Sequence, residues 1–176
     1  MASKSLILIT GANQGLGYYA AQQLASEGNY HVLLGSRDIN KAKTAIESLT
    51  NDTSVKVDAK NLEPLQIDID DDASIKAAVE SVEKNHGKLD ILLNNAAIAF
   101  PGEEDVLKAG GASLRDFYRQ HYETNVFGTV AAAEAFIPLL RKGEGKRLAF
   151  TSSSMGSMHE ATEGDLIPGV SLTSNS

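Results

Sequence analysis

The chain has 176 residues, 42% of them hydrophobic and 22% charged, which is typical of one soluble globular domain large enough to bury a substantial core. A net charge of -7 with no cluster of lysines or arginines argues against a nucleic-acid surface, and the absence of cysteine excludes disulfides, thiolate nucleophiles and cysteine metal sites. Neither a signal-peptide pattern nor an apolar run of membrane-spanning length is present, so we expect a cytoplasmic protein with no membrane partner.

The first half of the chain alternates apolar runs with helical patterns. Strands are predicted at residues 5–10, 31–35, 62–69 and 89–93; helices are predicted up to about residue 28, at residues 39–49, and from an acidic cap at residues 70–72 to about residue 85. The three acids suit the positive end of the helix dipole, and a metal site is the less favoured interpretation of them. Pro64 is acceptable early in a strand or at a sheet edge. This alternation predicts an α/β protein with a doubly wound parallel sheet.

The second half begins with a loop over residues 94–111. A long helix, in one or two segments, is predicted over residues 113–141, and a fifth strand over residues 147–152. Residues 130–137 are apolar on most of the helix surface, which indicates burial by several neighbours or by a partner chain. Residues 153–176 show no helical or strand period. The four histidines show no metal-binding spacing, so we expect them in loops or on the surface and predict no metal site.

A glycine-rich turn, Thr10-Gly11-Ala12-Asn13-Gln14-Gly15-Leu16-Gly17, follows the first strand and opens the first helix. Its glycines permit a tight turn and close approach to an anion, and the helix N-terminus presents unpaired N–H groups to it. The alternative is an ordinary strand–helix turn that contains glycine. The spacing G-x3-G-x-G differs from the commoner G-x-G-x-x-G of dinucleotide sites.

Three later segments support a dinucleotide site. They are Asn94-Asn95-Ala96-Ala97, Thr124-Asn125-Val126-Phe127-Gly128 and Phe150-Thr151-Ser152-Ser153-Ser154-Met155-Gly156. Together with the glycine turn, they resemble the short-chain dehydrogenase/reductase family over residues 5 to about 157. Residues 94–100 are most similar to its carbonyl-reductase-like branch. Ala97 departs from the family's N-N-A-G pattern, adding one methyl group and removing no hydrogen-bonding group.

The resemblance implies a Rossmann-type sheet of strand order 3-2-1-4-5, incomplete at the C-terminus, with an NAD(P)-binding domain over residues 1–157 and an irregular tail over residues 158–176. It implies hydride transfer between nicotinamide and a carbonyl or alcohol substrate, with Asn125 and Ser153 in catalytic positions. The implied cofactor-binding residues are Gly11, Asn13, Gln14, Gly15, Leu16, Gly17, Ser36, Arg37, Asp68, Ile69, Asn95, Ala96 and Ala97.

Arg37 favours NADP(H) over NAD(H). Dinucleotide folds that prefer NAD place an acid about twenty residues beyond the glycine turn, where it binds the ribose 2′-hydroxyl. Ser36 stands at that position here, and the adjacent guanidinium could bind a 2′-phosphate. The alternative makes Arg37 a solvated loop residue beside Asp38 as a helix cap, which is compatible with the first interpretation. Gln14 weakens the argument because many NADP-preferring members are basic there. Asp68 is interpreted either as an adenine contact or as a helix cap.

The family's proton-donating tyrosine, with a lysine four residues later, is missing from its expected place. None of the residues after Ser153 is a tyrosine or a lysine. The five tyrosines lie upstream, and none is followed by a lysine at that spacing. His159 is the tail residue that we consider as a substitute proton carrier, and an irregular tail would hold it poorly.

Two functions therefore stay open: a shortened oxidoreductase with impaired catalysis, and a catalytically silent NADP(H)-binding or protein-interaction module. Without further strands, residues 147–152 would form an uncovered apolar sheet edge, so we expect self-association there or through the long helix.

Overall fold

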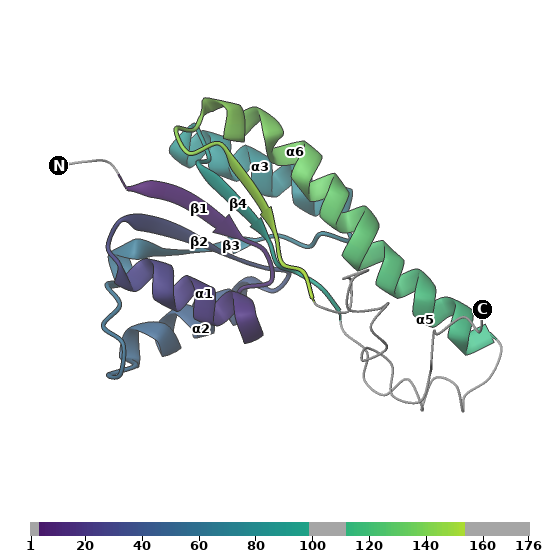
Figure 1. Ribbon diagram of the computed structural model, residues 1–176, viewed down its shortest axis with the longest axis horizontal. Coiled ribbons are helices and arrows are strands. Elements are labelled where there is room, and N and C mark those ends of the chain that lie inside the picture. Colours follow the sequence, from purple (N-terminus) through teal and green to yellow (C-terminus); the bar gives the residue numbers. More distant parts are fainter. Residues whose placement is uncertain (1–3, 99–111, 154–176) are drawn as a thin grey trace, which may run out of the picture.

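The computed structural model describes residues 4–98 and 112–153. A five-stranded parallel sheet of order β3-β2-β1-β4-β5 forms the centre, as the sequence predicted, with α1 and α2 on one face and α3 and α6 on the other (Figure 1). The strands are β1 (Ser5–Ile9), β2 (Tyr30–Ser36), β3 (Leu62–Gln66), β4 (Ile91–Asn94) and β5 (Arg147–Phe150). The helices are α1 (Gly15–Ser26), α2 (Ile39–Asn51), the 3₁₀ turn η1 (Ala59–Asn61), α3 (Asp72–His86), α5 (Ala112–Tyr122), the π-helical segment η2 (Glu123–Gly128) and α6 (Thr129–Lys142).

The central strands are apolar without alternation because helices cover both of their faces. In β1 and β2, successive residues such as Val32, Leu33 and Leu34 are all buried. Ile7 pairs with Val32 on one side and with Ile91 on the other, which places β1 between β2 and β4. The carboxyl ends of these strands therefore meet at one edge of the sheet.

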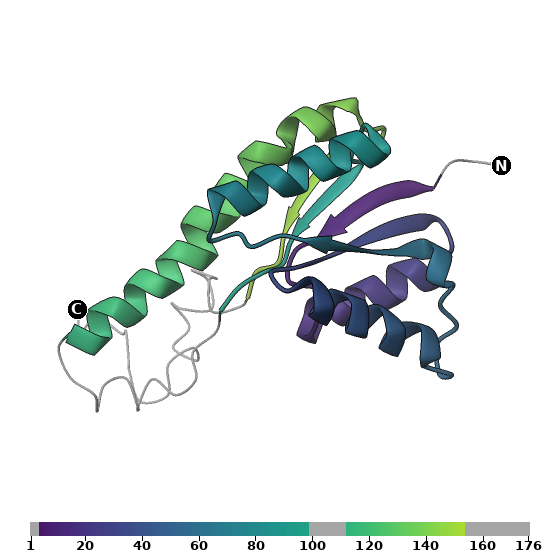
Figure 2. The ribbon, with the colours of Figure 1, turned by 180° about the vertical axis from the view of Figure 1, so that it is seen from behind.

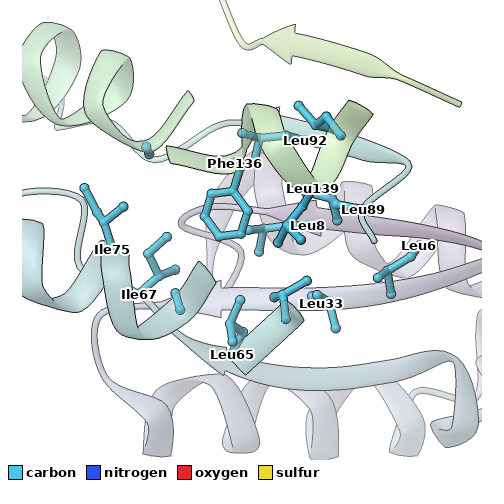
Figure 3. Packing of buried hydrophobic residues seen from close by; sticks show 14 of the residues in the cluster. Leu6, Leu8, Leu33, Leu65, Ile67, Ile75, Leu89, Leu92, Phe136 and Leu139 are labelled. Carbon is cyan, nitrogen blue, oxygen red and sulfur yellow. The ribbon is translucent and has the colours of Figure 1, made fainter. Parts of the chain in front are cut away.

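Each face of the sheet has its own hydrophobic cluster. One cluster packs α1 and α2 on the sheet through residues such as Ala21 and Leu49. The other packs α3 and α6 on the opposite face, where Phe136 and Leu139 are fully buried. Figure 3 shows the Phe136 ring surrounded by aliphatic side chains of the sheet and α3.

Several predicted elements differ from the structure in their bounds. The third strand ends at Gln66, three residues before the predicted end, since its partner β2 ends at Ser36 in register with it. The fourth strand begins at Ile91, two residues after the predicted start, and ends at Asn94. The long helix has two α-helical parts joined by the π-helical segment η2, which agrees with its prediction in one or two segments. Pro64 lies in β3, which is an edge strand, as expected.

Side-chain caps define the starts of α2 and α3. Asp38 accepts a hydrogen bond from Asn40 N, and Asp71 accepts one from Ala73 N, both at 2.9 Å. The acidic run before α3 therefore caps the helix, as the sequence predicted. Gly87 ends α3 in a left-handed conformation with a φ angle of 71°.

The side chain of the buried Asp90 connects two segments at the amino edge of the sheet, β1 and the turn before β5. Its carboxylate accepts hydrogen bonds from Leu6 N at 2.8 Å and Glu144 N at 2.6 Å, and it lies 3.3 Å from Lys88 Nζ. Burial raises the pKa of this carboxyl, but the hydrogen bonds outweigh burial and hold the pKa below its ordinary value. One side chain therefore joins β1 to the turn that leads into β5.

The helix formed by α5, η2 and α6 runs past the carboxyl edge of the sheet, so that α5 projects beyond it (Figures 1 and 2). Across residues 4–98 and 112–153, no helix combines the length and the apolar character needed to cross a membrane.

Candidate functional site

A glycine turn joins β1 to α1 at the carboxyl edge of the sheet. Gly11 and Gly15 have φ angles of 64° and 61°, in the left-handed region that favours glycine. A Cβ atom at Gly11 would lie 2.8 Å from Ala96 Cα, and one at Gly17 would lie 2.4 Å from Asn95 Nδ2. The turn therefore requires glycine both for its conformation and for its close approach to the segment after β4.

The start of α1 leaves its backbone N–H groups available to an anion. The N-cap residue Gln14 makes no side-chain capping hydrogen bond, and the first turn of the helix contains no acidic residue. Leu16, in that turn, is 73% exposed, and Asn13 is half-buried just before it. An open helix N-terminus with unpaired donors and a positive dipole end fits a phosphate group.

Hydrogen bonds from Thr10 and Asn95 hold the glycine turn against β4. The backbone N–H groups of Asn95 and Ala96 donate to Thr10 Oγ1, both at 3.0 Å. Asn95 Nδ2 donates to the carbonyl oxygens of Thr10 at 3.0 Å and Gly11 at 3.3 Å. Thr10 is buried and was not among the predicted site residues. Its place immediately before the first glycine was the only signal for this role.

The end of β2 exposes Arg37 beside a buried hydroxyl. Ser36 is 1% exposed, and its Oγ accepts a hydrogen bond from Asp38 N at 3.3 Å. Asp38 caps α2, so its carboxylate is turned to the helix start. The exposed Arg37 guanidinium makes no ion pair with any residue in the described ranges. Both sequence interpretations of this segment are compatible with this arrangement.

The end of β3 places two predicted residues in different environments. Asp68 is half-buried, and its Oδ1 accepts a hydrogen bond from Asp70 N at 3.2 Å, while its own N–H donates to Ser74 Oγ at 2.9 Å. These contacts are those of a local turn before α3. Ile69 is buried in the α3/α6 cluster, so only its backbone faces other groups at this edge.

Asn125 lies in η2 and binds the segment that follows β4. Its Oδ1 accepts from Ile98 N and its Nδ2 donates to Ile98 O, both at 2.9 Å. Thr124 Oγ1 donates to Asp70 Oδ2 at 2.8 Å, which fixes the same segment to the loop before α3. A π-helical segment frequently marks a functional position in a helix. Here it places the Asn125 side chain, with its two hydrogen bonds to the Ile98 backbone, at the carboxyl edge of β4.

Ser153 follows β5 at the same edge and is exposed. Thr151 N donates to Asn94 O at 2.9 Å, which continues the pairing of β5 with β4 up to this point. Ser154, Gly156, His159 and the predicted tail over residues 158–176 lie outside the described residues, as does most of the predicted loop after β4.

The five tyrosines lie in α1, β2 and α5. Tyr19, Tyr118 and Tyr122 are exposed on helices. Tyr18 packs against the α1/α2 cluster, where burial and the nearby Asp52 carboxylate raise the pKa of its phenol. A raised pKa makes a phenol a weaker acid.

The predicted cofactor residues thus come together where β1, β2, β3 and β4 end. The strand order changes direction between β1 and β4, and ligands of open α/β sheets bind at such a switch point. Ala97 is exposed beside Ala96 on this edge. The donor-rich helix start, the glycines and the exposed guanidinium fit a dinucleotide with two linked phosphates.

Comparisons with known proteins agree with this geometry. The family model described as short chain dehydrogenase matches residues 5–164. The chain belongs to the short-chain dehydrogenase family. Members of this family are oxidoreductases that use NAD(P).

Individual relatives give the same assignment. The chain is 44% identical over 156 residues to the short-chain dehydrogenase anuI of Penicillium roqueforti, covering 88% of this chain and 58% of that protein. Menthone neomenthol reductase from Mentha piperita has a similar structure, with a TM-score of 0.71, 29% identity, and coverage of 89% of this chain and 62% of that one. A structure of ElxO with NADPH bound is 25% identical with a TM-score of 0.69, covering 87% and 57%. This short-chain dehydrogenase chain therefore spans little more than half the length of the relatives it matches.

Proposed function

We propose that this chain is the NADP(H)-binding part of a short-chain oxidoreductase acting on a carbonyl or alcohol substrate. The observation that carries the proposal is the glycine turn, which is held against Asn95 and opens onto the N-terminus of α1. The turn and the first N–H groups of α1 would hold the pyrophosphate, and Asn95, Ala96 and Ala97 would line the nucleoside side. The bound nicotinamide would supply or accept the hydride.

The preference for NADP(H) rests on Arg37. The buried Ser36 adds no negative charge at the end of β2, and the Asp38 carboxylate is engaged as a helix cap. An exposed guanidinium beside this point would make charge-assisted hydrogen bonds to a 2′-phosphate. A similar solved structure, that of ElxO, has NADPH bound.

Catalysis in this chain is proposed to be impaired. Ser153 would bind the substrate oxygen, and Asn125 would order the adjacent backbone and a relay water. A proton must also pass to or from that oxygen, and no tyrosine or lysine follows Ser153 in the sequence. This same observation favours the alternative, a catalytically silent NADP(H)-binding or protein-interaction module.

Fluorescence titration of the purified chain with NADPH and NADH tests the cofactor. Arg37→Ala is expected to weaken NADPH binding by about tenfold or more, since hydrogen bonds to charged groups contribute about 1.5–3 kcal/mol, and to leave NADH binding unchanged. Lys41→Ala, at an exposed position on α2, is the matched charge control. Equal affinity for both nucleotides, unaltered in Arg37→Ala, would contradict the NADP(H) assignment.

The same protein is expected to oxidise NADPH negligibly with aldehydes, ketones and quinones. Turnover that Ser153→Ala abolishes would refute impaired catalysis, whereas nucleotide binding without turnover agrees with it.

Association with a second copy, through the β5 edge or the long helix, is part of the same proposal. Leu148 and Phe150 of β5, and Phe127 and Val130 of η2 and α6, are exposed apolar side chains on these two surfaces. The cytoplasmic location stays a prediction.

A further inference from the structure

Two histidines and a glutamate that are far apart in the sequence meet at the amino edge of the sheet. His31 is the second residue of β2, Glu63 is the second residue of β3, and His86 is the last residue of α3. The Nε2 atoms of His31 and His86 lie 3.1 Å and 3.3 Å from the same atom, Glu63 Oε2. All three ligand atoms lie within 4.8 Å of one another.

A backbone carbonyl determines which ring nitrogen of His31 carries a proton. His31 Nδ1 lies 3.1 Å from Lys60 O, and a carbonyl oxygen only accepts, so Nδ1 is the donor. In the neutral ring, Nε2 then has a lone pair directed at the Glu63 carboxylate. Two acceptors at this distance repel unless a cation lies between them.

His86 places a second ring nitrogen beside the same carboxylate oxygen. Its Nε2 is buried and makes no hydrogen bond with the described part of the chain, although the Glu63 oxygen lies only 3.3 Å away. Buried polar atoms in folded proteins nearly always have a partner. A cation held jointly by the three side chains would satisfy both nitrogens and neutralise the carboxylate.

We propose that His31, Glu63 and His86 form a binding site for a divalent transition-metal ion, with zinc as the best match. Two ligands on a tetrahedral zinc ion at about 2.05 Å are about 3.3 Å apart, close to the two nitrogen–oxygen separations found here. Imidazole and carboxylate suit zinc and its neighbours in the first transition row. The three side chains are partly exposed, which leaves water access for a fourth ligand.

A hydrogen bond to the backbone fixes the orientation of the His31 ring, as is usual for histidines that bind a metal ion. Ligating histidines usually donate their second ring nitrogen to a carbonyl or carboxylate, and Lys60 O takes this role for His31. The ligands come from β2, β3 and α3, so a bound ion would cross-link two strands to the end of a helix. This site lies at the amino ends of the strands, whereas the glycine turn lies at their carboxyl ends. Its function is accordingly to stabilise the fold.

Calorimetric titration with zinc chloride tests the site on the untagged, chelator-treated chain. One zinc ion per chain is expected, with a rise in the melting temperature, since a ligand of the folded state stabilises it. His31→Ala, Glu63→Gln and His86→Ala should each weaken binding by at least about 10- to 100-fold, the effect known for loss of an outer-shell partner. His121→Ala, which removes a histidine of α5, should bind zinc as the unaltered chain does.

Cobalt chloride gives a second measurement, because a histidine–carboxylate site of low coordination number produces visible absorption bands. Glu63→Gln keeps the size of the side chain, so it tests the site even if a histidine variant folds poorly. The proposal is overturned if the unaltered chain binds no zinc, as expected for a cluster held by protons alone. It is equally overturned if all three variants bind zinc as tightly as the unaltered chain.

Discussion

The two edge strands of the sheet are built differently. On β3, Leu62 and Leu65 are buried and belong to the two hydrophobic clusters. On β5, Leu148 is 41% exposed and Phe150 is 52% exposed, and neither belongs to either cluster of the described residues. An uncovered apolar edge strand favours pairing with another chain. The comparison shows one edge strand packed into the hydrophobic clusters and one edge strand that exposes apolar side chains, within the described residues.

The largest expected effect is a difference in the free energy of unfolding between variants of two phenylalanines, Phe136 of α6 and Phe150 of β5. Phe136→Ala should lower the free energy of unfolding by about 3–5 kcal/mol, because it leaves a cavity between α6 and the sheet. Phe150→Ala should change it by no more than about 0.5 kcal/mol, as expected for an exposed residue. Urea denaturation of both variants measures the difference. Similar losses in the two would show that the β5 edge is packed in solution.

A smaller effect is expected from Asp90, which connects β1 to the turn before β5. Asp90→Asn should lower the free energy of unfolding by about 1–3 kcal/mol at neutral pH, since buried backbone donors lose a charged acceptor. Asp116→Asn, which alters an exposed ion pair on α5, is the control and should have little effect.

The pH dependence follows from the lowered pKa of Asp90. Because the folded state holds this pKa below the unfolded value, the stabilisation is complete above the ordinary range of an aspartate, near pH 4. It is lost as the pH falls through the folded pKa. Denaturation between pH 7 and pH 3 should therefore show a shallower acid destabilisation in Asp90→Asn than in Asp116→Asn. Parallel curves for these two variants would contradict this role for Asp90.

Substitutions on the two edge strands, β5 and β3, are expected to change the free energy of unfolding least. On β5, a substitution is expected to change self-association instead. Phe150→Lys should reduce self-association, because a charged side chain on an edge strand opposes pairing. Gln66→Lys places the same charge on the exposed end of β3 and should leave association unchanged. Sedimentation velocity over a range of concentrations measures both. A monomeric unaltered chain would contradict association, and equal effects of the two variants would contradict the difference between the edges.

The order of the elements could be predicted because each has a clear hydrophobic period and a local start or stop signal. The Asp71 cap and the Gly87 ending of α3 are examples that depend only on nearby residues. Strand ends were less predictable. The end of β3 is set by pairing contacts with β2, where Ser36 and Gln66 are in register. These are contacts between segments distant in the sequence.

The glycine turn and its partners could be located from motifs, since their spacing is local. The role of Thr10 required the structure, because its hydroxyl binds N–H groups more than 80 residues away along the chain. The His31, Glu63 and His86 cluster could not be predicted from the sequence for the same reason. Its residues come from β2, β3 and α3, so no spacing within one helix or loop relates them. The NADP(H) preference and the catalytic roles of Asn125 and Ser153 stay predictions.

The π-helical segment at Glu123–Gly128 has a consequence for the register of the long helix. A π turn holds one residue more than an α turn, and each residue of an α-helix advances the side-chain direction by about 100°. The segment therefore rotates α5 relative to α6, so the two halves need not share one buried stripe. Deleting a single residue here is therefore expected to change the direction of Asn125 relative to Ile98. The π-helical segment therefore lets the side chains of α5 and those of α6 face different directions.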